Sequence, residues 1–354
     1  MRIAYIITHP GRTGVNRMVL DLVTLMQEHG HSCVVYYFHE KTARVVFPCP
    51  VLLWEGWKEL KGFDVIHTHG LKPELLVARR CLGGLRKNLG SGFEKTRLIT
   101  TVHCYCFQDL TDLYGAIRGY ALGVLALLAK NAFHKVVCLS RDMIDYYSKW
   151  ISREHLDYAY NTTLACHSDE KISDKELSVL TQLKGNGLLI GMVCVLIKRK
   201  GIDVMFHALK KLPDQYRLVI IGNGKEDESF KLMAKELGVA DRVHFLGYQP
   251  RAWRYLPYID IYAMPSRSEG FPLVLLEAAA CGTKVVASIL PVVKECFSED
   301  EVITFDMPEE QALADAIVKA SQSQQLGKKL QERFLKDYSP TAFYHRYMEI
   351  YGTT

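Results

Sequence analysis

The chain has 354 residues, of which 49% are hydrophobic and 23% charged, and this composition is typical of a folded protein with room for two domains. Its formal net charge of +5 is too small for this length to indicate nucleic acid as a partner. No stretch reaches the roughly 18 apolar residues that a membrane-spanning helix requires. The ten cysteines lack paired spacing, which indicates reduced thiols and favours a cytoplasmic location.

The first half of the chain alternates short β-branched runs with longer helical segments, as βαβ units do. Each run is apolar enough to be buried on both faces of a parallel sheet. The expected strands are 3–7, 32–37, 64–67, 98–102 and 135–139, with a first helix at 15–29. We therefore expect an N-terminal Rossmann-like domain over residues 1–170.

The same alternation restarts in the second half, after a polar stretch at 164–184 that is predicted to contain the linker. The expected strands there are 188–193, 218–222, 243–246, 259–263 and 284–287. They predict a second Rossmann-like domain over 185–337, followed by an aromatic helix at 338–354 that returns to the first domain. The fold class is thus α/β, with two doubly wound parallel sheets whose ligand sites lie beyond the carboxyl ends of the strands and face a shared cleft.

The most informative segment runs from 265 to 282 and leads from a strand end into a helix. Seven residues separate its two glutamates, Glu269 in the loop and Glu277 in the helix. The helix start, formed by Gly270, Phe271, Pro272 and Leu273, can receive a diphosphate because a helix N-terminus presents unpaired N–H groups and partial positive charge. For either glutamate alone, a salt bridge at the helix edge is the simpler interpretation.

Together these residues resemble the retaining glycosyltransferases of family 4, which have the GT-B fold and a motif of the form Ser-Glu-Gly-Phe-x-Leu-x-x-Leu-Glu-Ala. The resemblance covers most of the second half of the chain. It implies that Glu277 binds the ribose of a nucleotide-sugar donor and that Glu269 lies beside the donor sugar. The turn Gly222, Asn223 and Gly224 would lie near the base.

The resemblance also implies two cations on the loop after the first strand of the second domain, where they neutralise the leaving diphosphate. Lys200 matches the lysine, but Val195 stands where the family has arginine. Arg199 or Lys198 is the candidate replacement. A run of three basic residues is otherwise most simply a solvated surface or a helix cap.

In the first domain, a glycine-rich loop precedes the first helix, and Gly14 best matches the family's loop that meets the diphosphate. His103 matches the family's histidine near the transferred sugar, which would make it a catalytic residue with Glu269 and Lys200. For His67 a packing role is the alternative. Together with His69 and two nearby cysteines these histidines could suggest zinc, but the ligand spacing does not favour it.

The predicted reaction moves a hexose or N-acetylhexosamine from a nucleotide sugar, most simply a UDP-sugar, to a glycan or lipid-linked acceptor in surface polysaccharide synthesis. Capsule and lipopolysaccharide are the polysaccharides expected. No Asp-x-Asp motif lies in a suitable loop, so the reaction is expected to need no metal or other cofactor. The alternatives are a nucleotide-sugar 2-epimerase and a catalytically silent nucleotide-sugar-binding protein.

A basic segment in the first domain suggests a membrane or acceptor face, with an anionic membrane surface as a partner and a peripheral location on the inner face of the cytoplasmic membrane. Its relevant residues are Arg79, Arg80, Arg86 and Lys87. The apolar run 120–129 fits the same membrane face. A buried core helix is the alternative for that run.

Overall fold

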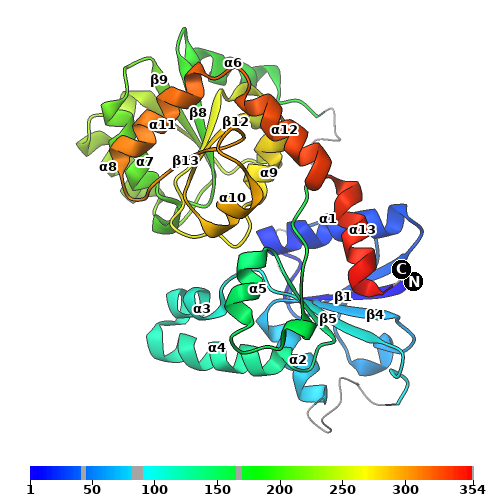
Figure 1. The fold of residues 1–354 in the computed structure, drawn as a ribbon. Helices are drawn as coiled ribbons and strands as arrows, with labels where there is room; N and C mark the ends of the chain where they lie inside the picture. The colour runs from blue at the N-terminus through cyan, green and yellow to red at the C-terminus, as the bar shows by residue number, and fades with distance from the viewer. Residues whose placement is uncertain (41–44, 82–90, 165–169, 353–354) are drawn as a thin grey trace. The chain divides into compact units, whose positions relative to one another are not determined.

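A computed structural model describes residues 1–40, 45–81, 91–164 and 170–352 of the chain. The chain divides into two compact units, each built on its own parallel sheet (Figure 1). The first unit comprises Met1–Thr162 and Pro340–Thr354, and the second comprises Thr163–Ser339. Arg86 and Lys87 lie outside the described residues, so their predicted place on a membrane or acceptor face is untested.

The first unit contains a seven-stranded sheet with the strand order β3-β2-β1-β4-β5-β6-β7. All neighbouring strands are parallel. Their bounds are β1 Arg2–Ile7, β2 Ser32–Tyr37, β3 Val51–Leu53, β4 Val65–His69, β5 Arg97–Thr101, β6 Lys135–Cys138 and β7 Leu156–Tyr158. The central strands β1 and β4 are almost entirely buried, as expected for a sheet covered by helices on both faces.

Two helices of the first unit begin at a side-chain cap. Helix α1 starts after Thr13, whose side chain accepts a hydrogen bond from the Asn16 amide, and α5 starts after Ser140, which caps Met143 in the same way. The bounds are α1 Gly14–Glu28, α2 Leu71–Cys81, α3 Cys106–Tyr114, α4 Ala116–Lys130, α5 Arg141–Tyr147 and α13 Pro340–Tyr351, with short 3₁₀ helices η1 Trp57–Leu60 and η2 Arg153–His155.

The C-terminal helix α13 is an integral part of the first unit although it is far from the rest of that unit in sequence. The Tyr344 ring stacks on His29, the C-cap of α1, with ring centroids 3.7 Å apart, and its hydroxyl lies 3.1 Å from His31 Nε2. The side chains of Tyr347 and Tyr351 are buried. Helix α13 therefore completes the core of a unit that otherwise ends at Thr162.

The second unit contains a six-stranded parallel sheet with the strand order β10-β9-β8-β11-β12-β13. The strand bounds are β8 Leu188–Val193, β9 Tyr216–Ile221, β10 Val243–Gly247, β11 Ile261–Met264, β12 Lys284–Ser288 and β13 Ile303–Phe305. The helices are α6 Asp174–Lys184, α7 Ile202–Lys211, α8 Asp227–Glu236, α9 Leu273–Ala280, α10 Pro291–Cys296, α11 Glu310–Gln322 and α12 Leu326–Asp337. The 3₁₀ helices are η4 Lys198–Lys200, η5 Ala240–Arg242 and η6 Ala252–Tyr258.

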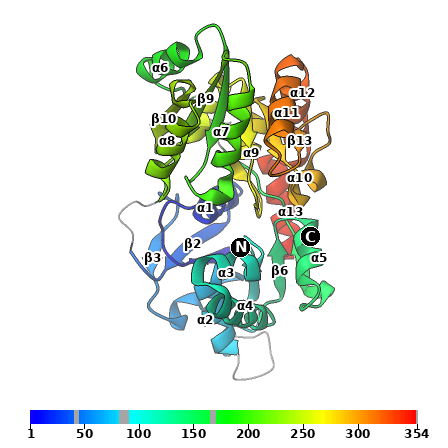
Figure 2. The same cartoon turned by 90° about the vertical axis from the view of Figure 1, so that its left-hand side faces the viewer.

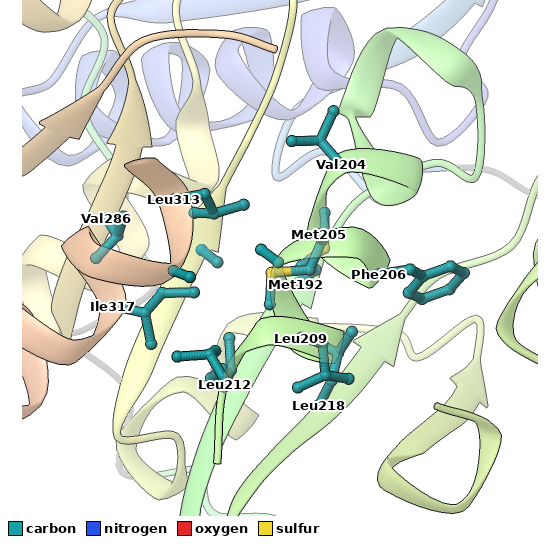
Figure 3. Close-up of a cluster of buried hydrophobic side chains, with 14 of the residues drawn as sticks. Met192, Val204, Met205, Phe206, Leu209, Leu212, Leu218, Val286, Leu313 and Ile317 are labelled. Atoms are coloured by element: carbon teal, nitrogen blue, oxygen red, sulfur yellow. The ribbon is translucent and has the colours of Figure 1, made fainter. Parts of the chain in front are cut away.

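The core of the second unit lies between the sheet and helices α7 and α11. Figure 3 shows Met205 and Leu209 of α7 beside Met192 of β8, with Leu313 and Ile317 of α11 nearby. These side chains are almost fully buried. Burying a side chain of this size contributes about 1.5–3 kcal/mol, so this layer fixes the strands whose ends form the candidate site.

The fold class predicted from the sequence, two doubly wound parallel α/β sheets, is confirmed. The three short strands β3, β7 and β13 were not expected, because runs of three residues carry too little apolar pattern to be recognised. The polar stretch at 164–184, which was predicted to contain the linker, includes helix α6 in its second half. Ser173 and Glu176 form a capping box that begins it.

In both units the strand order reverses at one place, which defines a topological switch point. The reversal lies between β1 and β4 in the first unit and between β8 and β11 in the second. Loops that follow adjacent strands diverge there, which leaves room for a ligand beyond the carboxyl ends of the strands. Figure 2 presents both sheets and their helices from a second direction.

Candidate active site

An ion pair lies at the switch point of the second unit. Lys200, from the loop after β8, donates a hydrogen bond of 2.6 Å from Nζ to Oε1 of Glu269, from the loop after β11. Their side chains are only 19% and 10% exposed. Ser266 donates a second hydrogen bond of 2.6 Å to the same carboxylate oxygen. The structure thus brings together two of the three predicted catalytic residues.

Backbone contacts hold the two loops together. Gly201 has a φ of +67°, and a Cβ on it would lie 1.8 Å from the carbonyl oxygen of Pro265, so only glycine fits there. Two residues further along, the Arg267 amide donates to the Arg199 carbonyl oxygen over 2.8 Å. The Arg267 guanidinium also forms a bidentate pair with Asp203 of α7, with N–O distances of 3.0 and 2.7 Å. Lys200 and Glu269 are therefore placed by fixed backbone.

The last residue of β12 also holds the loop after β11 in place. Ser288, the last residue of β12, donates a hydrogen bond of 2.5 Å to the Ser266 carbonyl oxygen. Both serines are essentially buried. The sequence analysis missed Ser266 and Ser288, because isolated serines after a strand carry no distinctive pattern. Their only signal was their position at the carboxyl ends of β11 and β12.

The glycine turn after β9 packs directly on the loop after β8. A Cβ on Gly222 would lie 1.9 Å from the Cys194 carbonyl oxygen, and one on Gly224 would lie 2.3 Å from the Leu196 carbonyl oxygen. The Asn223 carbonyl oxygen accepts a hydrogen bond of 3.0 Å from the Leu196 amide. The glycines of this turn thus have a packing role, whatever they contribute to a ligand.

Helix α9 begins at Leu273, directly after Pro272. Its first turn has no acidic residue and no side-chain cap, and such a helix start favours an anion. Phe271 is buried, with its ring centroid 6.4 Å from that of Tyr338. Gly270 and Phe271 would therefore contact a ligand through backbone groups rather than side chains. Glu277 lies within the helix as predicted and is 9% exposed.

Both predicted glutamates influence one buried hydroxyl. Burial raises the pKa of Tyr262 well above its usual value, and the electrostatic influence of nearby Cys194, Glu269 and Glu277 raises it further. Burial also raises the pKa of the Cys194 thiol to about 12, with Lys200 opposing and Glu269 reinforcing the shift. Tyr262 and Cys194 are thus neutral groups beside an ionised pair, which concentrates the charge of the site on Lys200 and the glutamates.

The remaining predicted cations lie in the same short turn as Lys200. Lys198 is exposed, and its carbonyl oxygen accepts a hydrogen bond of 2.6 Å from Arg267. Arg199 is partly buried, and Val195 is 56% exposed. The proposal that Arg199 or Lys198 replaces the family's arginine therefore stays a prediction.

In the first unit, His67 and His69 lie within β4 rather than after it, and His103 follows β5. His69 Nδ1 lies 3.1 Å from His103 Nε2. His67 instead bonds Thr101 Oγ1 and the Tyr351 hydroxyl, both over 2.8 Å. His67 thus fits the packing role that was its alternative. Its partner in α13 was missed because 284 residues separate the two in sequence.

These histidines are neutral. Burial lowers the pKa of His67 to about 3 and that of His103 to about 4, and it lowers the pKa of His69 well below its usual value. His69 Nε2 has no hydrogen-bond partner among the described residues. Within the described part of the chain, no group of three or more His, Cys, Asp or Glu side chains could hold a metal ion.

The glycine-rich loop of the first unit ends at Gly14, the first residue of α1. The buried side chain of Asn16 shapes this loop by donating to the carbonyl oxygens of His9, over 2.7 Å, and Gly11, over 2.6 Å. A Cβ on Gly14 would meet no atom of the described residues within 4 Å. Packing within the chain therefore does not explain the glycine at this position.

Comparisons with known proteins match most of the second unit to a family. Residues 174–337 match the family Glycosyl transferases group 1. The O-antigen biosynthesis glycosyltransferase WclY of Escherichia coli is 29% identical to this chain over an alignment 364 residues long. The alignment covers 99% of this chain and 98% of WclY.

Solved structures of low sequence identity share the fold along the whole chain. The structure of Anabaena Alr3699/HepE in complex with UDP and glucose has a TM-score of 0.81 and 18% identity, and covers 100% of both chains. The structure of WaaG, a glycosyltransferase involved in lipopolysaccharide biosynthesis, has a TM-score of 0.72 and 16% identity, and covers 99% of this chain and 100% of WaaG. Residues 174–337 therefore belong to the group 1 glycosyltransferases, and the chain is a glycosyltransferase of the GT-B fold.

Proposed function

We propose that this glycosyltransferase moves a hexose or N-acetylhexosamine from a UDP-sugar, with retention of configuration, to a glycan or lipid-linked acceptor in surface polysaccharide synthesis. The main support for the donor site is the ion pair at the switch point of the second unit, in which Lys200 Nζ lies 2.6 Å from Glu269 Oε1. Two relatives support the substrate classes. HepE is described in complex with UDP and glucose, and WclY is named for O-antigen biosynthesis.

In this proposal the donor diphosphate lies at the N-terminus of α9, beside Lys200 and Arg199. A helix start without acidic residues and a nearby ammonium group favour a doubly charged leaving group. Charge that develops on the diphosphate as the glycosidic bond breaks is stabilised by groups already in place. This electrostatic preorganisation supplies the stabilisation without a divalent cation.

Glu269 is assigned to the donor sugar rather than to covalent catalysis. Its Oε1 already accepts hydrogen bonds from Lys200 and Ser266, which stabilises a carboxylate in a fixed orientation. A carboxylate so held can accept a hydrogen bond from a sugar hydroxyl through Oε2. The acceptor hydroxyl would attack on the face that the diphosphate leaves, and its proton would pass to the departing phosphate oxygen.

Glu277 is assigned to the ribose of the nucleotide. Vicinal hydroxyls donate paired hydrogen bonds to a carboxylate, and Glu277 is a largely buried glutamate about one turn into the helix whose start would bind the diphosphate. The turn Gly222–Gly224 is assigned to the base. For His103 and Gly14 the proposed contacts with the sugar and the diphosphate stay predictions from the family resemblance.

A thermal-shift panel of UDP, GDP, ADP and their sugars tests this proposal on the wild type and on Glu277→Ala. A ligand at about 100 times its dissociation constant stabilises the folded state by ~2.7 kcal/mol. We expect a shift with UDP and one UDP-sugar that is lost in Glu277→Ala. Glu236→Ala, which alters the last residue of α8, is the control and should keep the shift. A guanine or adenine nucleotide that shifts the wild type instead would overturn the choice of donor.

Product analysis separates transfer from the alternative of 2-epimerisation. Incubation with the UDP-sugar alone should release UDP slowly or not at all and should leave the sugar's configuration unchanged. Addition of a glycan acceptor should give stoichiometric UDP. An interconverted free nucleotide sugar in the absence of acceptor would contradict the proposed transfer.

A further inference from the structure

The buried imidazole of His69 contacts His103, one of the predicted catalytic residues. Strand β4 ends at His69 and pairs with β5, so that His69 lies opposite Thr101 in the sheet (Figure 1). His103 follows two residues after Thr101. The two rings meet there, with His69 Nδ1 3.1 Å from His103 Nε2. The contact therefore joins the ends of two neighbouring strands, one of which borders the switch point of the first unit.

His69 differs from its neighbour His67 in the partners of its two ring nitrogens. Both nitrogens of His67 have hydrogen-bond partners, in Thr101 and Tyr351. His69 is only 1% exposed, yet its Nε2 has no partner within the part of the chain that the structure describes. A buried polar atom without a partner lowers stability, and an apolar side chain would fill the same space without that cost. Packing alone therefore does not explain an imidazole at this position, whereas a hydrogen bond to His103 does.

The unpaired Nε2 atom indicates which nitrogen of His69 carries the proton. Burial lowers the pKa of both His69 and His103, so each neutral ring has one N–H donor and one acceptor nitrogen. With the proton of His69 on Nε2, a fully buried N–H group would have no acceptor, and such orphaned donors are rarer in proteins than orphaned acceptors. With the proton on Nδ1, His69 donates a hydrogen bond to His103 Nε2. The partners of the ring thus assign the proton to Nδ1.

The tautomer of His69 determines that of His103. A neutral imidazole nitrogen that accepts a hydrogen bond carries no proton, so the single proton of His103 is on Nδ1. Among the described residues, His103 Nδ1 has no hydrogen-bond partner, and the side chain is partly exposed. His103 therefore presents an N–H donor, rather than a lone pair, to a ligand at this strand end.

We propose that His69 is a positioning residue that holds His103 as a hydrogen-bond donor, through Nδ1–H, to a hydroxyl oxygen of the transferred sugar. His103 contacts that sugar in the proposed function, on which this inference rests. A histidine held in this tautomer cannot act as a general base toward the ligand, because its free nitrogen already carries the proton. His103 thus orients the sugar, and the proton of the acceptor hydroxyl is left to the departing phosphate oxygen.

Nuclear magnetic resonance of the full chain, with isotope-labelled histidine and without ligand, tests the tautomer and requires no variant of His69. Long-range proton–nitrogen correlations distinguish the two neutral tautomers of an imidazole. The signals of His103 are identified by their absence from the spectrum of His103→Asn. We expect both His69 and His103 of the wild type to carry the proton on Nδ1. An Nε2–H tautomer of His103 would overturn the proposal, because His69 would then be the acceptor.

Two substitutions of His69 separate hydrogen bonding from packing. His69→Leu removes the donor but still fills the buried space, and we expect kcat to fall about tenfold because the sugar is oriented less precisely. The KM for the nucleotide sugar should change by less than about twofold, since the contacts with the nucleotide are retained. His69→Asn places an amide N–H near the position of Nδ1–H and should restore kcat to within about threefold of the wild type. Equal kcat values for the two variants, whether low or unchanged, would overturn the positioning role.

A control variant and the nucleotide thermal shift keep these outcomes distinct. His207→Leu alters an exposed histidine of α7 and should retain wild-type kcat. Both His69 variants should keep the thermal shift with UDP, which shows that they fold and bind nucleotide. If the wild type binds the UDP-sugar but His103 is the Nε2–H tautomer, this inference alone fails. If no nucleotide shifts the wild type, the proposed function fails, and the sugar contact of His103 fails with it whatever the tautomer.

Discussion

The carboxyl ends of the two sheets carry opposite electrostatic characters although the sheets are built alike. In the second unit, Lys200 and Glu269 form an ion pair that keeps part of its surface exposed. In the first unit, His67 and His69 are fully buried and neutral, and burial lowers the pKa of His67 to about 3. Charge is thus kept where solvent, and in our proposal a diphosphate, can reach it.

The difference arises from what covers the strand ends. In the first unit, helix α13 supplies Tyr347 and Tyr351, whose hydroxyls lie 3.3 Å from Thr101 Oγ1 and 2.8 Å from His67 Nδ1. An aromatic helix satisfies these polar groups and excludes water from them. In the second unit, the loops after β8 and β11 bond each other through backbone and leave side chains at the edge. The same topology therefore gives polar groups covered by a helix in the first unit and partly exposed side chains in the second.

The largest expected effect concerns the buried ion pair Lys130–Glu74 of the first unit. It tests the rule that a charge buried in this unit depends on its partner. Lys130→Met leaves the Glu74 carboxylate, which is 4% exposed, without its ammonium partner. Removing one member of a buried pair costs about 3–5 kcal/mol, because the remaining charge is desolvated and unpaired. Urea unfolding should show this loss of unfolding free energy. The double variant Glu74→Leu/Lys130→Met should recover most of it.

The control for this prediction is an exposed pair in the same unit. Arg153 and Asp145 lie 2.7 Å apart, but their side chains are 70% and 68% exposed. Arg153→Met should change stability by less than about 1 kcal/mol. Equal losses for Lys130→Met and Arg153→Met would contradict the rule, because burial would then have no bearing on the cost of an unpaired charge.

The second prediction concerns the partly exposed side chains of the second unit. Lys200→Met should lower the rate of transfer, or of nucleotide-sugar hydrolysis without acceptor, by about 10² to 10³, equivalent to ~2.7–4 kcal/mol, because one stabilising charge on the leaving group is lost. Steady-state kinetics should show the loss mainly in kcat. Lys210→Met, in the exposed last turn of α7, is the matched control and should retain near wild-type rates. Wild-type kcat in Lys200→Met would refute the proposed role.

The sequence predicted the framework of this site well because its signals are local. The helix boundary near Pro272 and the positions of Glu269 and Glu277 follow from residues that are adjacent in the chain. Strands of four to six residues were found for the same reason. The placement of Lys200 beside Glu269 was inferred only through a family resemblance, since 69 residues separate them.

The parts that could not be predicted depend on long-range contacts. No pattern connects Tyr351 with His67, because the contact depends on where a terminal helix packs. Ser266 is an ordinary serine until Lys200 and Glu269 are placed around it. The exposure of one side of α4 was also undetermined, since both of its sides are apolar and periodicity cannot tell the buried side from the exposed one.

A third prediction uses the pH dependence of stability to test whether His67 of the first unit is neutral. The unfolded-state pKa of a histidine is about 6.5, whereas that of folded His67 is about 3. Below pH 6.5 the unfolded chain binds a proton that the folded chain does not, so stability present above pH 6.5 is lost as the pH falls toward 3. The expected loss for this residue is about 1 kcal/mol between pH 6.5 and 5.5, because the unfolded histidine is already half protonated at pH 6.5.

Urea unfolding at these two pH values measures the effect. His67→Asn should lower the pH dependence of the unfolding free energy by about that amount, whatever its effect on stability at pH 7.5. His244→Asn, which alters an exposed histidine of the second unit, should leave the pH dependence unchanged. The same pH dependence in His67→Asn and the wild type would mean that His67 is not held neutral.

The smallest expected effect concerns Ser266, which orients Glu269 but in our proposal touches no substrate. Ser266→Ala removes one of two hydrogen bonds to Oε1, while the bond from Lys200 remains. A bond of this kind contributes about 1 kcal/mol, so kcat should fall by about fivefold, far less than in Lys200→Met. Ser229→Ala, at an exposed position of α8, should have no effect. A fall as large as that of Lys200→Met would place Ser266 among the groups that contact substrate. An unchanged kcat would mean that Lys200 alone orients the carboxylate, and the partly exposed site of the second unit would then depend on one ion pair rather than on a network.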